Sequence, residues 1–105
     1  MKGAAEFFLD VLTEDPKTGK LNLVPGISPE NHPQANAHKW NLWTTGASAT
    51  AQILRDLFAA VAESAAILGK EAEDAETLKA LAACRARLEP LKVGRWGQLQ
   101  EWTED

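Results

Sequence analysis

One run of residues, from Ser48 to Leu68, constrains the fold of this chain more than any other part of its sequence. Its apolar residues recur every three or four positions, which is the spacing of one broad face of an α-helix. They are Ile53, Leu54, Leu57, Phe58, Val61, Ala65 and Leu68. The side chain of Ser48 or Thr50 is expected to cap the start of this helix, and Gly69 is expected to end it.

Two further helices are predicted around this one. Residues 73–88 have apolar positions spaced for one helical face, acidic residues in the first turn, and Arg85 and Arg87 in the last turn before Pro90. Residues 1–13 form a shorter amphipathic run that stops before Pro16, which lacks the amide hydrogen that a helix needs. The predicted fold class is therefore mainly α, with the helices paired as hairpins.

The remaining segments are predicted to be extended or irregular. Residues 15–19 have the composition of a turn, and residues 21–23 alternate weakly, as in a short strand. Residues 25–46 collect three prolines, both histidines and two tryptophans, which predicts a long loop. Loops of this length are uncommon in compact domains and tend to carry function. Residues 91–105 are expected to form a second extended arm.

Composition limits the class of protein and its partners. A chain of 105 residues suits a single domain, and 45% hydrophobic with 25% charged residues is typical of a folded, soluble protein. A net charge of -4 without a dense basic run argues against a nucleic-acid partner. Neither a membrane-spanning run nor an apolar export signal is visible, so the localisation stays open. The single cysteine, Cys84, predicts a packing role, and we expect no disulfide, metal or cofactor.

The long loop contains the first candidate for chemistry. Its sequence Ser28-Pro29-Glu30-Asn31 presents one acid in a proline-stiffened segment, and amide side chains and tryptophans follow. A glycosidase needs an acid to protonate the leaving oxygen, amides to bind sugar hydroxyls and a ring to stack on the pyranose. An isolated Ser-Pro-Glu is also a common turn or helix cap, and this simpler interpretation stays open.

The second candidate lies in the C-terminal arm and comprises Gln98, Gln100, Glu101, Trp102 and Asp105. The alternative interpretation of this cluster is an amphipathic strand. In that case Trp96 and Trp102 would fill gaps in the core, while the polar residues would face water.

Four runs, taken in order along the whole chain, resemble the α-L-fucosidases of glycoside hydrolase family 95. They are MKGAAEFFLD continuing to EDPKTG in residues 1–19, SPEN in residues 28–31, QILRDLF in residues 52–58, and GQLQEW with the final acidic pair in residues 97–105. Each run alone is weakly specific, and their order and spacing make the resemblance much stronger.

The resemblance implies a fold and an activity. The family's catalytic domain is an (α/α)6 toroid, and its members invert configuration while they hydrolyse terminal α-linked L-fucose. The resemblance makes Glu30 the general acid and a fucosylated carbohydrate the partner. For substrate contacts we expect Asn31, Trp40, Trp43, Glu101 and Trp102.

The resemblance also implies an incomplete site. In the family, the asparagines that hold the nucleophilic water lie upstream of this region and the base aspartate lies downstream, so residues 1–105 are expected to be a single segment of a catalytic domain without activity of its own. The Met-Asp pair that the family usually has before Gln52 is replaced by Ala49 and Thr50. The alternative function is a non-enzymatic helical module that self-associates through exposed helix faces. A residual sugar-binding site is a third hypothesis.

Overall fold

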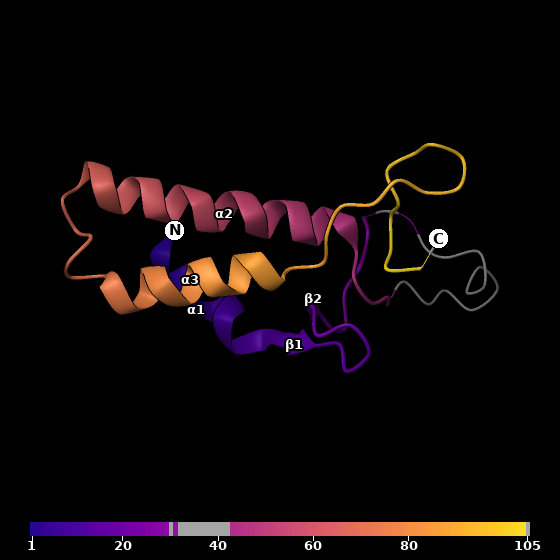
Figure 1. Cartoon of the computed structure of the whole chain (residues 1–105), viewed down its shortest axis with the longest axis horizontal. Helices are drawn as coiled ribbons and strands as arrows, with labels where there is room; N and C mark the ends of the chain where they lie inside the picture. Colours follow the sequence, from indigo (N-terminus) through magenta and orange to yellow (C-terminus); the bar gives the residue numbers. More distant parts are fainter. Residues whose placement is uncertain (30, 32–42, 105) are drawn as a thin grey trace.

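The computed structural model describes residues 1–29, 31 and 43–104. The described residues form three helices and one two-stranded antiparallel sheet in an elongated arrangement (Figure 1). In chain order the elements are α1 (Lys2–Val11), β1 (Leu12–Glu14), β2 (Leu21–Leu23), α2 (Ser48–Ile67) and α3 (Ala75–Arg87). The prediction of a mainly helical chain is confirmed.

The core lies where the three helices meet. Helices α2 and α3 run side by side as a hairpin, and α1 packs against both of them (Figure 1). Phe58 and Leu54 from α2 and Leu81 from α3 are almost completely buried, and Ala5 of α1 reaches them. Burying a side chain of this size contributes roughly 1.5–3 kcal/mol, so this small cluster supplies much of the stability of the chain.

The predicted apolar face of α2 is too broad. Ala51, Leu54, Phe58, Val61 and Ala65 form the buried stripe, at helical spacing. Ile53 and Leu68, which were expected on the same face, are 63% and 71% exposed. The stripe is narrow because, among the described elements, only α1 and α3 cover α2.

The C-terminal end of α2 is set by a local residue, whereas its N-terminal end is stabilised by a residue distant in the sequence. Gly69 has a φ of 63°, so the predicted glycine stop is confirmed. The prediction that Ser48 or Thr50 caps the start is wrong, because Ala47 occupies the N-cap position and no side chain bonds there. The backbone N–H of Ser48 donates instead to the carbonyl oxygen of Glu101 at 2.8 Å.

The N-terminal helix ends earlier than expected. It stops at Val11 because Leu12–Glu14 leave the helix and pair antiparallel with Leu21–Leu23. The connecting turn is confirmed: the Asp15 carboxylate accepts hydrogen bonds from the N–H of Lys17 at 2.8 Å and the hydroxyl of Thr18 at 3.0 Å. These bonds hold the pKa of Asp15 below its usual range.

The C-terminal arm and the described residues that lead into α2 lie at one end of the molecule, opposite the α2–α3 connection (Figure 1). Gly26 and Thr44 form an antiparallel pair, with both N–H···O bonds between 2.7 and 2.8 Å. Gly46 adopts a φ of 67°, and a Cβ atom added there would lie 1.8 Å from the Thr103 hydroxyl. The C-terminal arm therefore packs directly onto the backbone that leads into α2.

The described helices include no segment with the length and apolar character needed to cross a membrane.

Candidate active site

The predicted site residues divide into those that the structure describes and those that it does not. Glu30 and Trp40 lie outside the described residues. Asn31, Trp43, Glu101 and Trp102 are described, and Asn31 and Glu101 are in direct contact.

A carboxylate from the C-terminal arm meets the Ser-Pro-Glu-Asn segment. Glu101 Oε1 accepts hydrogen bonds from Ser28 Oγ at 2.6 Å and from Asn31 Nδ2 at 2.8 Å. The backbone N–H of Asn31 also donates to the carbonyl oxygen of Ser28 at 2.6 Å, which closes the turn. The two clusters that the sequence suggested separately are thus in contact.

The loop that carries the predicted acid is closed at its base. Backbone hydrogen bonds between Gly26 and Thr44 join the segment that enters the loop to the segment that leaves it. Thr44 Oγ1 also donates to the Gly26 carbonyl oxygen at 3.3 Å. A side chain at Gly26 would lie 3.0 Å from the Leu23 carbonyl, so the chain passes close to itself here. The segment that carries Ser28 and Asn31 is therefore anchored by the pair between Gly26 and Thr44.

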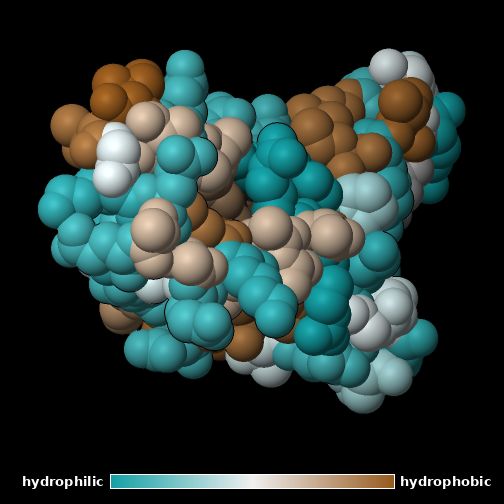
Figure 2. All heavy atoms as spheres, turned by 60° about the vertical axis from the view of Figure 1, so that its left-hand side comes forward, coloured by the Kyte–Doolittle hydropathy of each residue, from teal (hydrophilic) through white to brown (hydrophobic). Residues whose placement is uncertain are grey.

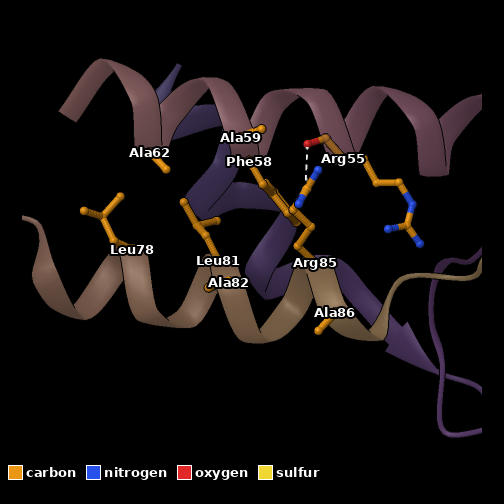
Figure 3. A pocket seen from close by; sticks show the side chains of 9 residues that line it. All are labelled: Arg55, Phe58, Ala59, Ala62, Leu78, Leu81, Ala82, Arg85 and Ala86. Carbon is orange, nitrogen blue, oxygen red and sulfur yellow. Dashed lines mark hydrogen bonds between the residues drawn. The ribbon is translucent and has the colours of Figure 1, made fainter. Parts of the chain in front are cut away.

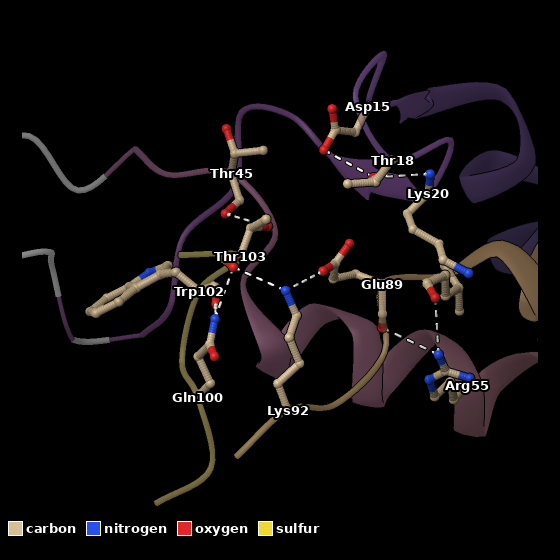
Figure 4. A network of polar contacts seen from close by, with 11 residues as sticks. Asp15, Thr18, Lys20, Thr45, Arg55, Glu89, Lys92, Gln100, Trp102 and Thr103 are labelled. Atoms are coloured by element: carbon tan, nitrogen blue, oxygen red, sulfur yellow. Dashed lines mark hydrogen bonds and ion pairs between the residues drawn. The ribbon is translucent and has the colours of Figure 1, made fainter. Parts of the chain in front are cut away.

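A network of buried polar groups supports the arm behind Glu101 (Figure 4). Gln100 donates from Nε2 to the carbonyl oxygens of Trp102 and Thr103, each at 2.8 Å. Lys92 Nζ donates to the same Thr103 carbonyl at 3.0 Å and pairs with Glu89 at 2.7 Å. The Glu89 side chain is only 8% exposed, and the ion pair with Lys92 offsets part of the cost of burying it.

Sequence reasoning missed most of this network. Glu89 precedes Pro90 and looked like the end of a helix, while Lys92 stood alone between apolar residues. A further missed residue is Asn22 of β2, which is 4% exposed and whose Nδ2 has no hydrogen-bond partner. The local signal for the Glu89–Lys92 pair is the opposite charge of two residues three positions apart, whereas no local pattern indicates that Asn22 is buried.

The tryptophans occupy different environments. Trp43 is 63% exposed at the end of the loop, whereas Trp102 is half-buried and its Nε1 has no hydrogen-bond partner. Trp96 is 78% exposed and stacks under the guanidinium of Arg95, with 4.5 Å to the ring centroid. The interpretation that Trp96 fills a gap in the core is therefore wrong.

A pocket of about 330 Å³ lies away from this site, in the groove between α2 and α3 (Figure 3). It is lined by Arg55, Phe58, Ala59, Ala62, Leu78, Leu81, Ala82, Arg85 and Ala86. Arg85 Nε donates across it to the Arg55 carbonyl at 3.2 Å. The lining is aliphatic and basic without a carboxylate, so it lacks the acid that glycoside hydrolysis needs.

Cys84 packs in the core, as predicted, and burial raises the pKa of its thiol. Residues 1–29, 31 and 43–104 hold no group of three or more histidine, cysteine or acidic side chains arranged for a metal ion.

Comparison with known proteins identifies the family. The model of the glycosyl hydrolase family 95 catalytic domain matches residues 1–105, which is the whole chain. The chain belongs to glycosyl hydrolase family 95. Two curated family relatives agree with this match.

The probable alpha-fucosidase A of Aspergillus niger is 32% identical over 108 residues, and alpha-L-fucosidase 2 of Arabidopsis thaliana is 31% identical over 105 residues. Both alignments cover all of this chain. They cover 13% and 12% of the respective relatives, so this family 95 chain spans about one eighth of their length.

Proposed function

We propose that this chain is the segment of an inverting α-L-fucosidase that carries the general acid, Glu30, and that it is inactive by itself. The observation that carries the proposal is the family match over all 105 residues, together with the contact of Glu101 with Ser28 and Asn31. The same assignment makes the helical hairpin part of an (α/α)6 toroid and a fucosylated carbohydrate the substrate.

The chemistry of inversion explains why the segment alone is not expected to turn over. The acid protonates the leaving oxygen while a base, roughly 6.5–9.5 Å away, activates water on the other face of the sugar. In this proposal, the base and the residues that hold the water belong to the part of an enzyme as long as these relatives that residues 1–105 do not cover. A positioned acid alone contributes only about 10²–10⁴-fold to the rate.

For sugar binding, we infer that Asn31, Trp43 and Trp102 contribute contacts, with Trp40 from the same loop. An exposed indole such as Trp43 offers an apolar face for the pyranose ring, and the Asn31 amide oxygen can accept from a hydroxyl. Trp102 is half-buried and its Nε1 atom is inaccessible, so its sugar contact would be made by the exposed part of the indole ring.

A chromogenic α-L-fucoside tests the catalytic part of the proposal. We expect no hydrolysis above background for the chain alone, and the same result for Glu30→Gln. Robust hydrolysis that Glu30→Gln abolishes would show that the chain is a complete enzyme and would contradict its proposed incompleteness.

Fluorescence titration with L-fucose tests sugar binding. We expect a spectral change that Trp43→Phe reduces and that Trp96→Phe leaves intact, because Trp96 lies on a different exposed turn against Arg95. L-fucose should act more strongly than D-galactose, which serves as the control sugar. A flat titration at high L-fucose concentration would remove the binding site from the proposal.

The exposed helix faces favour a second candidate function, self-association as a small helical module. Ile53 and Ile67 of α2 are 63% and 76% exposed, and Phe7 of α1 is 57% exposed. Figure 2, with the α2–α3 turn brought toward the viewer, shows apolar patches between hydrophilic ones on this face. Static light scattering distinguishes the candidates: a strictly monomeric species at all concentrations would exclude self-association.

A further inference from the structure

One carboxylate oxygen of Glu101 bonds to the first and the last residue of the 28–31 turn. Its Oε1 accepts from Ser28 Oγ and from Asn31 Nδ2, at 2.6 and 2.8 Å. Hydrogen bonds to an ionised acceptor are roughly twice as strong as those between neutral groups. Ser28 is 5% exposed, so its bond to Glu101 is shielded from water. The predicted acid, Glu30, stands between these two donors in the sequence.

The backbone of Glu101 is fixed independently of its carboxylate. Its carbonyl oxygen accepts from the N–H of Ser48 at 2.8 Å. Ser48 is the first residue of α2, and an amide in the first turn of a helix has no acceptor within the helix. Next to Glu101, the N–H of Gln100 donates to the Lys92 carbonyl at 2.8 Å. The carboxylate is therefore presented from a fixed point at the positive end of α2.

We propose that Glu101 is a positioning residue that fixes the 28–31 turn by connecting Ser28 and Asn31 to the N-terminal end of α2. This assigns its carboxylate to the turn, in place of the sugar contact that the sequence predicted. The link to catalysis rests on the proposed function, since it requires Glu30 to be the acid. The link between Glu101 and the turn does not, because it involves only Ser28, Asn31 and Ser48.

Nuclear magnetic resonance of the isotope-labelled chain tests the linkage. In the unaltered chain, the side-chain amide protons of Asn31 should resonate downfield, as expected of a donor that is hydrogen-bonded to a carboxylate. In Glu101→Ala this downfield shift should disappear, and exchange of the Asn31 backbone N–H should accelerate by at least about tenfold, equivalent to about 1.4 kcal/mol. The amide signals of Phe58 and Leu81 report whether the helical core is intact.

Two further variants separate positioning from a general structural effect. Glu101→Gln keeps an oxygen acceptor of the same reach, so it should restore slow exchange at Asn31. Glu104→Gln, an exposed neighbour in the same arm, should behave like the unaltered chain. If Glu101→Ala does not fold, Ser28→Ala removes one donor and should still accelerate exchange at Asn31.

The inference is overturned if Glu101→Ala leaves both the side-chain amide signals of Asn31 and the exchange of its backbone N–H unchanged. It is also overturned if Glu101→Gln fails to restore slow exchange, since the effect would then be one of charge and not of geometry. None of these measurements uses a sugar. A chain with a Glu101-dependent turn and no response to L-fucose would retain the positioning role and refute the sugar-binding proposal.

Discussion

Replacement of Gly46 by alanine should loosen the C-terminal arm at a predictable cost. Gly46 has a φ of 67°, and the left-handed region costs a residue with a Cβ atom roughly 1–2 kcal/mol. The new methyl group would also lie 1.8 Å from Thr103 Oγ1 and 3.1 Å from Thr103 Cβ. Relief of such an overlap typically costs a further 1–3 kcal/mol. We therefore expect Gly46→Ala to destabilise the docked arm by about 2–5 kcal/mol.

Gly69 provides the matched control. Its φ of 63° is nearly the same, but a Cβ atom added there meets nothing within 4 Å. Gly69→Ala should thus cost only the backbone contribution of roughly 1–2 kcal/mol. In a Thr103→Ala background the overlap with the hydroxyl is absent, so the penalty of Gly46→Ala should fall by about 1 kcal/mol or more.

The assay combines urea unfolding, followed by far-ultraviolet circular dichroism, with amide exchange of the Ser48 N–H. The Ser48 N–H donates a hydrogen bond to the Glu101 carbonyl oxygen. Its exchange therefore reports the opening of the arm even where the helices stay folded. Gly46→Ala should accelerate this exchange, and Gly69→Ala should not. Equal effects of the two substitutions on Ser48 would refute the packing of Thr103 against Gly46.

Three further predictions concern the helical core. Phe58→Ala should lower the free energy of unfolding by about 3–5 kcal/mol in urea titrations, since the ring is 2% exposed, and Phe58→Leu should cost clearly less. Arg55→Met should cost roughly 1–3 kcal/mol in the same titration, because Arg55 Nη2 donates to the carbonyls of Leu88 and Glu89 at 3.1 and 3.2 Å; an unchanged midpoint would contradict this. Cys84 should react with Ellman's reagent far more slowly in the folded chain than in urea. Because burial raises its thiol pKa, the stability it contributes is complete below its unfolded pKa of about 8.5 and declines as the pH rises above it.

The helices could be predicted because their signals are local. The apolar spacing in α2, Gly69 at its end and the arginines in the last turn of α3 all act within a few residues, and each prediction is confirmed. The spacing also overestimated the buried face, because apolar periodicity shows which residues can be buried and not how many neighbours are present to bury them. Ile53 is exposed for this reason.

The candidate site could be predicted only in parts. The residue types of the 28–31 segment suggested an acid loop, and Glu101 stood out in the arm, but nothing in either run indicates that the two meet. Their contact depends on how the α2–α3 hairpin returns the chain to the start of α2. The prediction of the α2 N-cap was wrong for the same reason. The N–H of Ser48, at the start of the helix, donates to the carbonyl oxygen of the distant Glu101, and no local hydroxyl caps the helix.

The bond between Ser28 and Glu101 also sets an order of events during synthesis. The two residues are 73 positions apart, so the 28–31 turn leaves the ribosome long before the carboxylate that holds it. Closing a loop of this length in an unstructured chain would cost roughly 4 kcal/mol of entropy. The α2–α3 hairpin can form first and shorten the distance to be closed. A nascent chain halted before residue 101 would therefore have a folded hairpin and an untethered turn, and the turn would be fixed only once Glu101 emerges.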